Sequence, residues 1–287
     1  MTWRFLHRLS IAAISLTLLT PTALAQADGQ KSFATENEAL AGLVAAVRSG
    51  DASQLQSILG PDSEQITSSG DAVADKHSRD VFLQKYDAKH TLASSGENEM
   101  TLNIGDDLWP VPIPLMHAGN EWYWDGAAGE QEIVYRRIGH NELDAINVCK
   151  GVLAAQKDYA AAPHDGSPAG AYASRILSQP GTQNGLYWEV KEGEPPSPAG
   201  PMLADADAQG YDTSKVTPYH GYYYRMLKNP DGFGFLAYPA QYRTSGVMTF
   251  QVSQKGIIYQ KDLGEKTADL AQQMTDFKID SSWKPVR

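Results

Sequence analysis

An apolar stripe between residues 141 and 160 constrains the fold more than any other feature of the sequence. Side chains at spacings of three and four share one face of a helix, and here they are Leu143, Ile146, Cys149, Val152, Leu153, Gln156 and Tyr159. Asn141 is a favourable N-cap, and Asp144 suits the first turn of a helix. A helix with such a stripe has to bury it against another element.

The last third of the chain supplies a sheet for that helix to pack on. Four strand candidates follow closely on one another: "GYYYRML", "GFGFLAYP", "SGVMTFQVS" and "GIIYQKDLG". Met248, Phe250 and Val252 alternate with their neighbours at the period of two that is typical of a half-buried strand. Gly256 in "SQKG" suits a hairpin loop. We therefore predict a long helix packed on an antiparallel sheet, followed by a helix from about 265 to 274.

The N-terminal half favours helices and a few strands. Thr35 and Glu38 form a capping box, Gly50 suits a left-handed C-cap and Asp51 suits a second N-cap. A third helix is expected from about 75 to 86. Residues 98–125 change character: "MTLNIGDDLWPVPIPL" alternates and then meets three prolines, which predicts an edge strand or an extended connector, and "NEWYWD" is a short strand. "AAGEQEIVYRRIG" returns to helical spacing.

These patterns predict an α+β protein with two regions. The first, residues 26–137, is helical with a few strands, and the second, residues 138–287, is the helix on its sheet. Residues 161–220 are rich in turn-forming residues and form a long loop region with short helices and the strand-like "GLYWEV". Long loops in a compact domain usually cover a site or carry function.

The first 25 residues have the pattern of a signal peptide. Arg4 and Arg8 precede an apolar run that ends in Ala23-Leu24-Ala25, so that Gln26 would begin the mature chain. The run is short and interrupted for a transmembrane helix, although an uncleaved N-terminal anchor is the alternative. The expected location is therefore the periplasm or the medium, with no membrane span after the signal is removed.

The charge of the chain excludes one class of partner. The formal net charge is −10 and no basic cluster is present, whereas phosphate contacts require concentrated Lys and Arg. We expect no nucleic acid partner.

Cys149 is the one cysteine, so no internal disulfide can form. It is buried and inert, reactive, or paired between chains. Its place within the apolar stripe favours a buried thiol that behaves as a small apolar group.

Several short patterns resemble sites of chemistry without matching them. His164, Asp165 and Ser167 are close together, but they lie in a loop, and members of a triad usually come from separate elements. His140 and Asp144 could share a helix face as metal ligands, or Asp144 could serve the helix start alone. Neither a nucleophile elbow nor a phosphate loop is present. We expect no cofactor and no metal.

Acidic residues offer two further possibilities. "DADAQGYD" begins like a calcium loop with Asp205 and Asp207, but Val216 stands where a bidentate Glu is required. A carboxylate pair for cleaving a polymer could come from the four acids near the tryptophans, which are Asp106, Asp107, Glu121 and Asp125.

Taken together, several segments identify a family resemblance. "LYWEV…SPAGP", "YHGYYYRML", "GFLAYPAQY", "SGVMTFQVSQKGIIYQKDLG" and "RRIGHNELDAI" resemble an exported bacterial family known as domain of unknown function family 2950. The resemblance extends from about Phe33 to Trp283 and implies export, but it supplies no catalytic residues. The stretch between "YYYRML" and "GFGFLAYP" is shorter than the family pattern, which puts any function of that loop in doubt.

Residues 140–262 also resemble the globular part of type IV pilins and pseudopilins, in which a helix packs across an antiparallel sheet. The hydrophobic N-terminal spine of a pilin is missing before this helix. The resemblance implies a pilin-like fold without the polymerising part.

These observations lead to two hypotheses for function. The first is a non-enzymatic exported protein that binds an envelope partner, protein or polymer, through aromatic and cationic side chains of the loop and sheet. The predicted binding residues are Trp188, Tyr223, Arg225, Tyr238 and Tyr242. The alternative is a hydrolase that acts on an envelope polymer through a carboxylate pair, and convergence of two acids with a His or Trp in one deep pocket would favour it.

Overall fold

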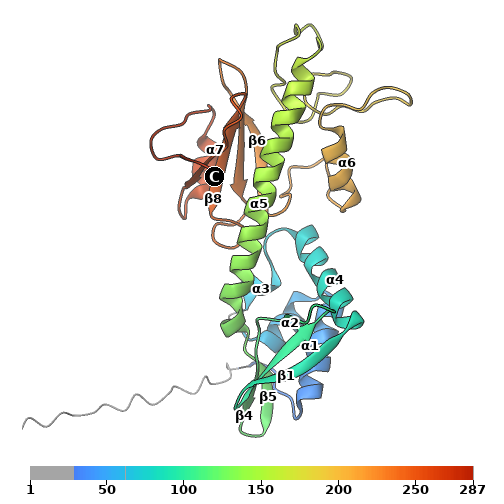
Figure 1. Ribbon diagram of the computed structural model, residues 1–287, viewed down its shortest axis with the longest axis vertical. Coiled ribbons are helices and arrows are strands. Elements are labelled where there is room, and N and C mark those ends of the chain that lie inside the picture. Colours follow the sequence, from blue (N-terminus) through green and yellow to red (C-terminus); the bar gives the residue numbers. More distant parts are fainter. Residues whose placement is uncertain (1–28, 62, 287) are drawn as a thin grey trace, which may run out of the picture.

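The computed structural model describes residues 29–61 and 63–286, so the signal peptide predicted for residues 1–25 lies outside the described residues. One long helix, α5 (Gly126–Ala160), runs through the molecule, with a lobe packed on each half (Figure 1). We call them the N-lobe and the C-lobe. The boundary expected at residues 137 and 138 therefore falls inside a helix.

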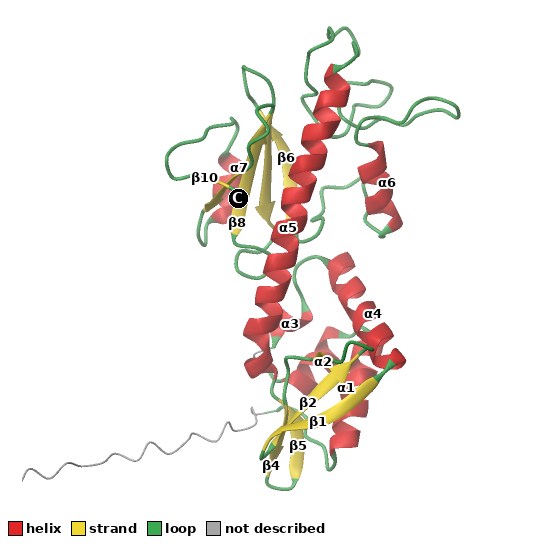
Figure 2. Ribbon diagram, in the orientation of Figure 1, coloured by secondary structure: helices red, strands yellow, loops and turns green. Residues whose placement is uncertain are grey.

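The N-lobe combines four helices with a small antiparallel sheet. The helices are α1 (Glu36–Ser49), α2 (Ala52–Leu59), α3 (Glu64–Thr67) and α4 (Ala72–Ala88). The strands are β1 (His90–Gly96), β2 (Glu99–Ile104), β3 (Trp109–Pro110), β4 (Leu115–Ala118) and β5 (Glu121–Trp124), in the order β1-β2-β4-β5 with β3 beside β2 (Figure 2). Trp124 is fully buried in this core, and its indole Nε1 donates to the Ala39 carbonyl at 2.9 Å.

Local capping signals in the N-lobe are confirmed. The Thr35 hydroxyl accepts from the Glu38 amide at 3.2 Å, and Gly50 ends α1 with a φ of 67°. Asp51 accepts from two amides at the start of α2. Within residues 98–125, where an edge strand or connector was expected, β2 is instead a central strand that pairs with β1, β3 and β4. The prolines fall after β2, between residues 105 and 114, where the only strand is the two-residue β3.

Helix α5 corrects the prediction for its own start. Asp125 caps it, its side chain accepting from the Ala128 amide at 3.0 Å, and the helix continues through Gly139 without a break. Asn141 is therefore not an N-cap: it lies mid-helix, and its side-chain amide donates to the Ser245 carbonyl at 2.9 Å. Leu143, expected in the buried stripe, is 63% exposed.

The C-lobe confirms the helix on an antiparallel sheet. Its strands are β6 (Tyr222–Leu227), β7 (Gly234–Pro239), β8 (Met248–Ser253), β9 (Tyr259–Asp262) and β10 (Lys284–Pro285), in the order β10-β9-β8-β7-β6. Cys149 and Val152 of α5 pack with Phe235 and Phe250 on one face of the sheet. Helix α7 (Thr267–Gln273) packs through Ala271 on the other face.

The long loop between α5 and β6 contains the helix α6 (Gly200–Ala208). The strand-like "GLYWEV" is not a strand: it contributes an isolated bridge between Tyr187 and Leu177. Asp205 and Asp207 lie in α6 rather than in an open turn. Within the described residues, no helix is long and apolar enough to cross a membrane.

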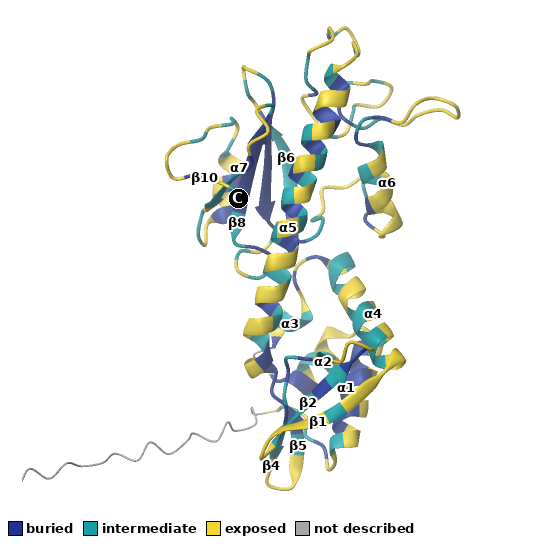
Figure 3. Ribbon diagram, viewed as in Figure 1, coloured by how far each residue is buried: buried dark blue, intermediate teal, exposed yellow. Residues whose placement is uncertain are grey.

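Helix α4 packs differently from the other long helices. It has 17 residues and none of them is fully buried (Figure 3). Its apolar side chains Phe82, Leu83 and Tyr86 are only partly covered although they pack against the N-lobe core. This incomplete packing marks the position of a cavity.

Candidate functional site

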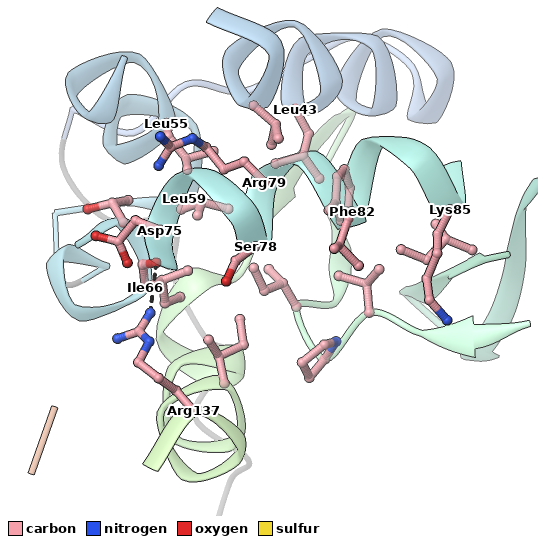
Figure 4. A pocket seen from close by; sticks show the side chains of 18 of the residues that line it. Leu43, Leu55, Leu59, Ile66, Asp75, Ser78, Arg79, Phe82, Lys85 and Arg137 are labelled. Carbon is pink, nitrogen blue, oxygen red and sulfur yellow. Dashed lines mark hydrogen bonds between the residues drawn. The ribbon is translucent and has the colours of Figure 1, made fainter. Parts of the chain in front are cut away.

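A cavity of about 360 Å³ lies under α4 in the N-lobe, and we call it the apolar chamber (Figure 4). Its walls come from α1, α2, α4, the strands of the N-lobe sheet and the first half of α5. Most of its lining is aliphatic or aromatic, including Leu43, Leu55, Leu59, Phe82 and Ile104. In Figure 4, the side chains of Asp75, Arg79 and Arg137 gather at one end of the chamber and Lys85 lies at the other.

A second cavity, of about 690 Å³, lies between the two lobes, and we call it the interlobe cleft. It is more polar than the chamber and rich in cations and histidines: His77, Arg136, Arg137, His140 and His220 all line it. The chamber and the cleft share six lining residues, which are Ile66, Asp75, Ser78, Trp109, Ile133 and Arg137. The two cavities therefore adjoin, an apolar one beside a polar one.

Arg137 lies where the two cavities meet. Its guanidinium donates to the backbone carbonyls of Gln65 at 2.7 Å and Ile66 at 3.2 Å, both in α3. Burial lowers the pKa of this guanidinium, and the charge of Asp75 opposes that shift. Among the described residues no carboxylate lies within ion-pair distance of Arg137, so it has hydrogen-bond acceptors but no counter-charge in direct contact.

Asp75 offsets only part of the positive charge around it. Both of its carboxylate oxygens accept from the Ser69 amide, at 3.0 and 3.2 Å. It is the sole carboxylate among the described residues that line the chamber and the cleft. Arg136 is paired with Glu132 at 2.6 Å, so the excess positive charge at the junction comes from Arg79 and Arg137, which gather with the single carboxylate of Asp75.

Histidine and carboxylate side chains form a network at the C-lobe wall of the cleft. His220 Nδ1 lies 2.5 Å from Asp144 Oδ2, and His220 Nε2 lies 2.8 Å from Gln209 Oε1. His140 Nε2 is 3.3 Å from the same Asp144 oxygen. Asp144 thus contacts two histidines. It lies in the middle of α5 and not in the first turn of a helix, where it was expected.

Asp71 joins the lobes beside the cleft. One of its carboxylate oxygens caps α4 through the Ala74 amide at 3.0 Å. The other accepts from the Tyr211 hydroxyl at 3.1 Å and from the Gly221 amide at 2.9 Å, both in the C-lobe. Burial and the Asp71 charge raise the pKa of Tyr211 well above its ordinary value. The hydroxyl therefore remains a donor to Asp71 at neutral pH.

The structure does not bring the five predicted binding residues together. Tyr223 and Tyr238 pack on each other with ring centroids 5.5 Å apart, on the sheet face that α7 covers. Arg225 donates from the same face to the Ala271 and Met274 carbonyls.

The other two predicted residues lie elsewhere. Tyr242 lies in the β7–β8 loop, where its hydroxyl donates to Asp262 at 3.2 Å. Trp188 packs near His164 and Tyr159, beside the far end of α5. Their role in binding stays a prediction.

The acids proposed for hydrolysis also lie apart. Asp107 pairs with Lys85 at 2.8 Å, Glu121 accepts from the Ser32 hydroxyl at 2.7 Å, and Asp125 caps α5. Asp106 is an exposed residue of the turn before β3. The described residues contain no group of three or more His, Cys, Asp or Glu side chains arranged to hold a metal ion.

Sequence reasoning missed the cavity residues, and a signal was present for some of them. Arg136 and Arg137 were read only as part of a helical pattern, although two adjacent arginines on an apolar helix are a noticeable feature. His220 has a φ of 50° beside Gly221 at 73°, so a tight turn aims its ring at α5. No local pattern in "TPYHG" indicates that partner.

Comparison with known proteins gives one match. A family model described as "Protein of unknown function (DUF2950)" matches residues 30–232 and 229–286. No curated protein and no solved structure matches the chain, so the likeness to pilins receives no support.

Proposed function

Because the chain belongs to the DUF2950 family, whose description names no activity, we propose from its own geometry that it is a binding protein for amphipathic acids. The ligand has an apolar chain of the fatty-acyl kind and an anionic head. The apolar chain of the ligand lies in the apolar chamber, and its anionic head lies among the cations at the junction with the interlobe cleft.

The observation that carries the proposal is Arg137, a half-buried cation without a carboxylate ion pair among the described residues, at the junction of an apolar and a polar cavity. An anionic head would supply the missing counter-charge. Burial of an apolar chain in the chamber would supply the driving force. The chamber and the cleft, about 360 and 690 Å³, both fall within the usual range for small-molecule sites.

Helix α4 supports the proposal as a cover for the chamber. Its side chains Val81 and Phe82, which line the chamber, would gain apolar contacts with a bound acyl chain that they lack without it. Elements with few fully buried residues are the ones that open locally at low cost in free energy. The chamber can therefore admit a ligand without unfolding the lobe.

Hydrolysis of a polymer is less well supported. That reaction requires two carboxylates that flank one bond. Asp75 is the only carboxylate among the described residues that line the two cavities. The proposed location is the periplasm or the medium, on the strength of the signal-peptide pattern of residues 1–25. The mass of protein recovered from those fractions tests this, because the mature chain would begin at Gln26.

Displacement of cis-parinaric acid tests the proposed function. This acid fluoresces in apolar surroundings, so we expect its emission to rise on binding and to fall when palmitate is added. Arg79 lines the chamber and has no ion pair or hydrogen bond among the described residues. Arg79→Glu should lower the affinity for palmitate at least about tenfold, equivalent to about 1.4 kcal/mol. The affinity for methyl palmitate, which has no charge, should not change in this variant.

Two variants complete the test. Lys76→Glu makes the same change of charge on the same helix, at a side chain that is 71% exposed and outside both cavities, and should leave palmitate binding unchanged. Leu55→Trp fills the chamber and should weaken both palmitate and its methyl ester. Equal affinities in the wild type, Arg79→Glu and Leu55→Trp would contradict the proposed site, and no emission change in the wild type would contradict the ligand class.

A further inference from the structure

The outer edge of strand β6 is open along its middle. β6 is the last strand of the C-lobe sheet and pairs with β7 alone. Tyr222 exchanges two backbone hydrogen bonds with Tyr219 on the side away from β7, at 2.9 and 3.2 Å. At the other end, Lys228 bonds through its amide and carbonyl to Thr275 and Phe277, at 2.9 and 2.8 Å.

The period of a strand identifies the open groups. Backbone groups of alternate residues point to the same side of a strand, so those of Tyr224 and Met226 point outward like those of Tyr222 and Lys228. Within the part of the chain that the structure describes, the amides and carbonyls of Tyr224 and Met226 have no backbone partner on that side. Among the described residues, two backbone amides and two backbone carbonyls are therefore unpaired along the middle of this edge, between the hydrogen-bonded residues Tyr222 and Lys228.

A groove of about 450 Å³ runs along this edge. Tyr223, Tyr224, Arg225 and Met226 all line it, although successive side chains point to opposite faces of a strand. A cavity that contacts four consecutive residues has to lie beside the strand rather than over one face. Its opposite wall comes from α6 and the second half of α5, through Val152, Met202 and Leu203 among others.

The charges beside the groove favour an acidic occupant. Arg175 lines it, is exposed, and has no ion pair among the described residues. Arg225 uses one terminal nitrogen on the carbonyls of Ala271 and Met274, and its Nε is buried without an acceptor. A carboxylate on the occupant would give these guanidinium groups the acceptor that they lack.

We propose that the edge of β6 is a second binding site, which takes up an extended peptide segment as an additional strand. The peptide pairs its backbone with Tyr224 and Met226, places apolar side chains toward α5 and α6, and presents an acidic side chain to Arg225 and Arg175. Binding by strand addition draws affinity from the main chain and specificity from alternate side chains. The contrast with the other edge supports this, because β10 is only two residues long.

A capped peptide, acetyl-TVEVT-amide with a fluorescent label, tests the proposal on the full-length mature protein. Two N-methylated versions are the decisive probes: one is methylated at the odd positions and the other at the even positions. Strand addition uses only one of these two sets of amides, so one version should lose at least tenfold in affinity while the other binds like the parent. Equal affinities for the two versions would overturn the proposal, since side-chain contacts alone do not distinguish them.

Amide hydrogen exchange and charge supply independent readouts. Tyr224 and Met226 amides should exchange fast in the free protein and slow at least tenfold when the peptide binds, while those of Tyr223 and Arg225, paired with β7, stay slow throughout. Changing the peptide glutamate to glutamine, or Arg175→Gln in the protein, should weaken binding several-fold. Protection of Tyr224 and Met226 that grows with protein concentration without peptide would assign the edge to a second copy of the chain and overturn the proposal.

Discussion

At the scale of the residue, Cys149 shows how burial controls chemistry. Its side chain is fully buried between α5 and the C-lobe sheet, where it packs with other apolar groups. That burial raises the pKa of the thiol from 9.0 to about 12. The reactive species of cysteine is the thiolate, so the folded protein should resist thiol reagents at neutral and mildly alkaline pH.

The raised pKa of Cys149 predicts a loss of stability at alkaline pH. Between pH 9 and pH 12 the unfolded chain releases the thiol proton and the folded chain keeps it. The Cys149 contribution is therefore complete below pH 9 and is lost as the pH rises through that window, by about 1.4 kcal/mol per unit. Urea unfolding of wild type and Cys149→Ala measures this as a difference that narrows above pH 9.

The matched comparison for that experiment is Cys149→Ser. A hydroxyl without a partner at this position costs about 1–3 kcal/mol, and it does not titrate in the same window. The difference in unfolding free energy between wild type and Cys149→Ala would stay constant up to pH 11 if the thiol were accessible. Rapid labelling of Cys149 at pH 8 would show the same.

The Tyr222-Tyr223-Tyr224 run and Arg225 show which contacts a strand pattern predicts and which it does not. The sequence predicts that one side of the Tyr222-Tyr223-Tyr224 run is core, and Tyr222 is fully buried against Phe250. The period of two also places Arg225 on the same face as Tyr223. No local pattern indicates that α7 covers that face, because α7 follows some 40 residues later along the chain.

At the scale of the element, two glycines of α5 predict opposite effects of one substitution. Gly139 is exposed, and a methyl group added there meets no atom within 4 Å. Gly129 is buried, and the same methyl group would lie 2.6 Å from Ile113 Cγ1 and 2.8 Å from the Pro112 carbonyl oxygen. The first position lacks a side chain without structural need, whereas the second allows α5 to approach the N-lobe closely.

Gly139→Ala should therefore stabilise the protein by about 1 kcal/mol, because alanine favours the helix and restricts the unfolded chain. Gly129→Ala should destabilise it by about 1–3 kcal/mol through overpacking. Urea denaturation of the two variants measures both changes. A loss of stability in Gly139→Ala would mean that α5 bends or breaks at this residue rather than continuing through it.

Elements with local signals are the ones that sequence predicts well. The capping residues Thr35, Asp51 and Gly50 act within a turn of their own helix, and β6 to β9 have strong periodicity, so all were expected. The sequence pattern places the start of α5 at Asn141 because Asn is a good cap and Asp144 suits the first turn. Tertiary packing overrides both preferences, since the helix is held on both sides of Gly139 by different lobes.

The candidate site was far less predictable than the fold. Its residues come from α3, α4, α5 and the loop before β6, and no two of these contributions are readable as one motif. Asp71 and Tyr211, for example, are 140 residues apart along the chain. Aromatic residues suggest a binding surface instead, but Tyr223 and Tyr238 pack against each other on the sheet face that α7 covers.

At the scale of the whole molecule, Asp71 couples the two lobes. It is 2% exposed, caps α4 and accepts from Tyr211 and Gly221 across the lobe boundary. Asp71→Ala removes one cap and leaves two buried donors of the C-lobe without their acceptor. The cost should be at least about 3 kcal/mol, since a cap is worth about 1 and a hydrogen bond to a charged group about 1.5–3.

Asp51→Ala is the control for Asp71→Ala. Asp51 also caps a helix through two amides, but it is exposed, and among the described residues its side chain accepts hydrogen bonds only from Ser53 and Gln54 of α2. Hydrogen exchange measured by mass spectrometry separates the two effects: residues 211–221 should lose protection in Asp71→Ala and keep it in Asp51→Ala. Unchanged protection of 211–221 in both variants would mean that Asp71 serves α4 alone.

The continuity of α5 has a mechanical consequence. Its 35 residues form a rod about 50 Å long, and both lobes are fixed to it through their cores. A rod of this kind resists the hinge closure by which many two-lobed proteins trap their ligands. The distance between the lobes is therefore nearly constant, and the moving part has to be lighter than a lobe. Helix α4 meets that condition, and under the proposed function we expect the rates of ligand uptake and release to depend on local opening of α4 rather than on movement of a lobe.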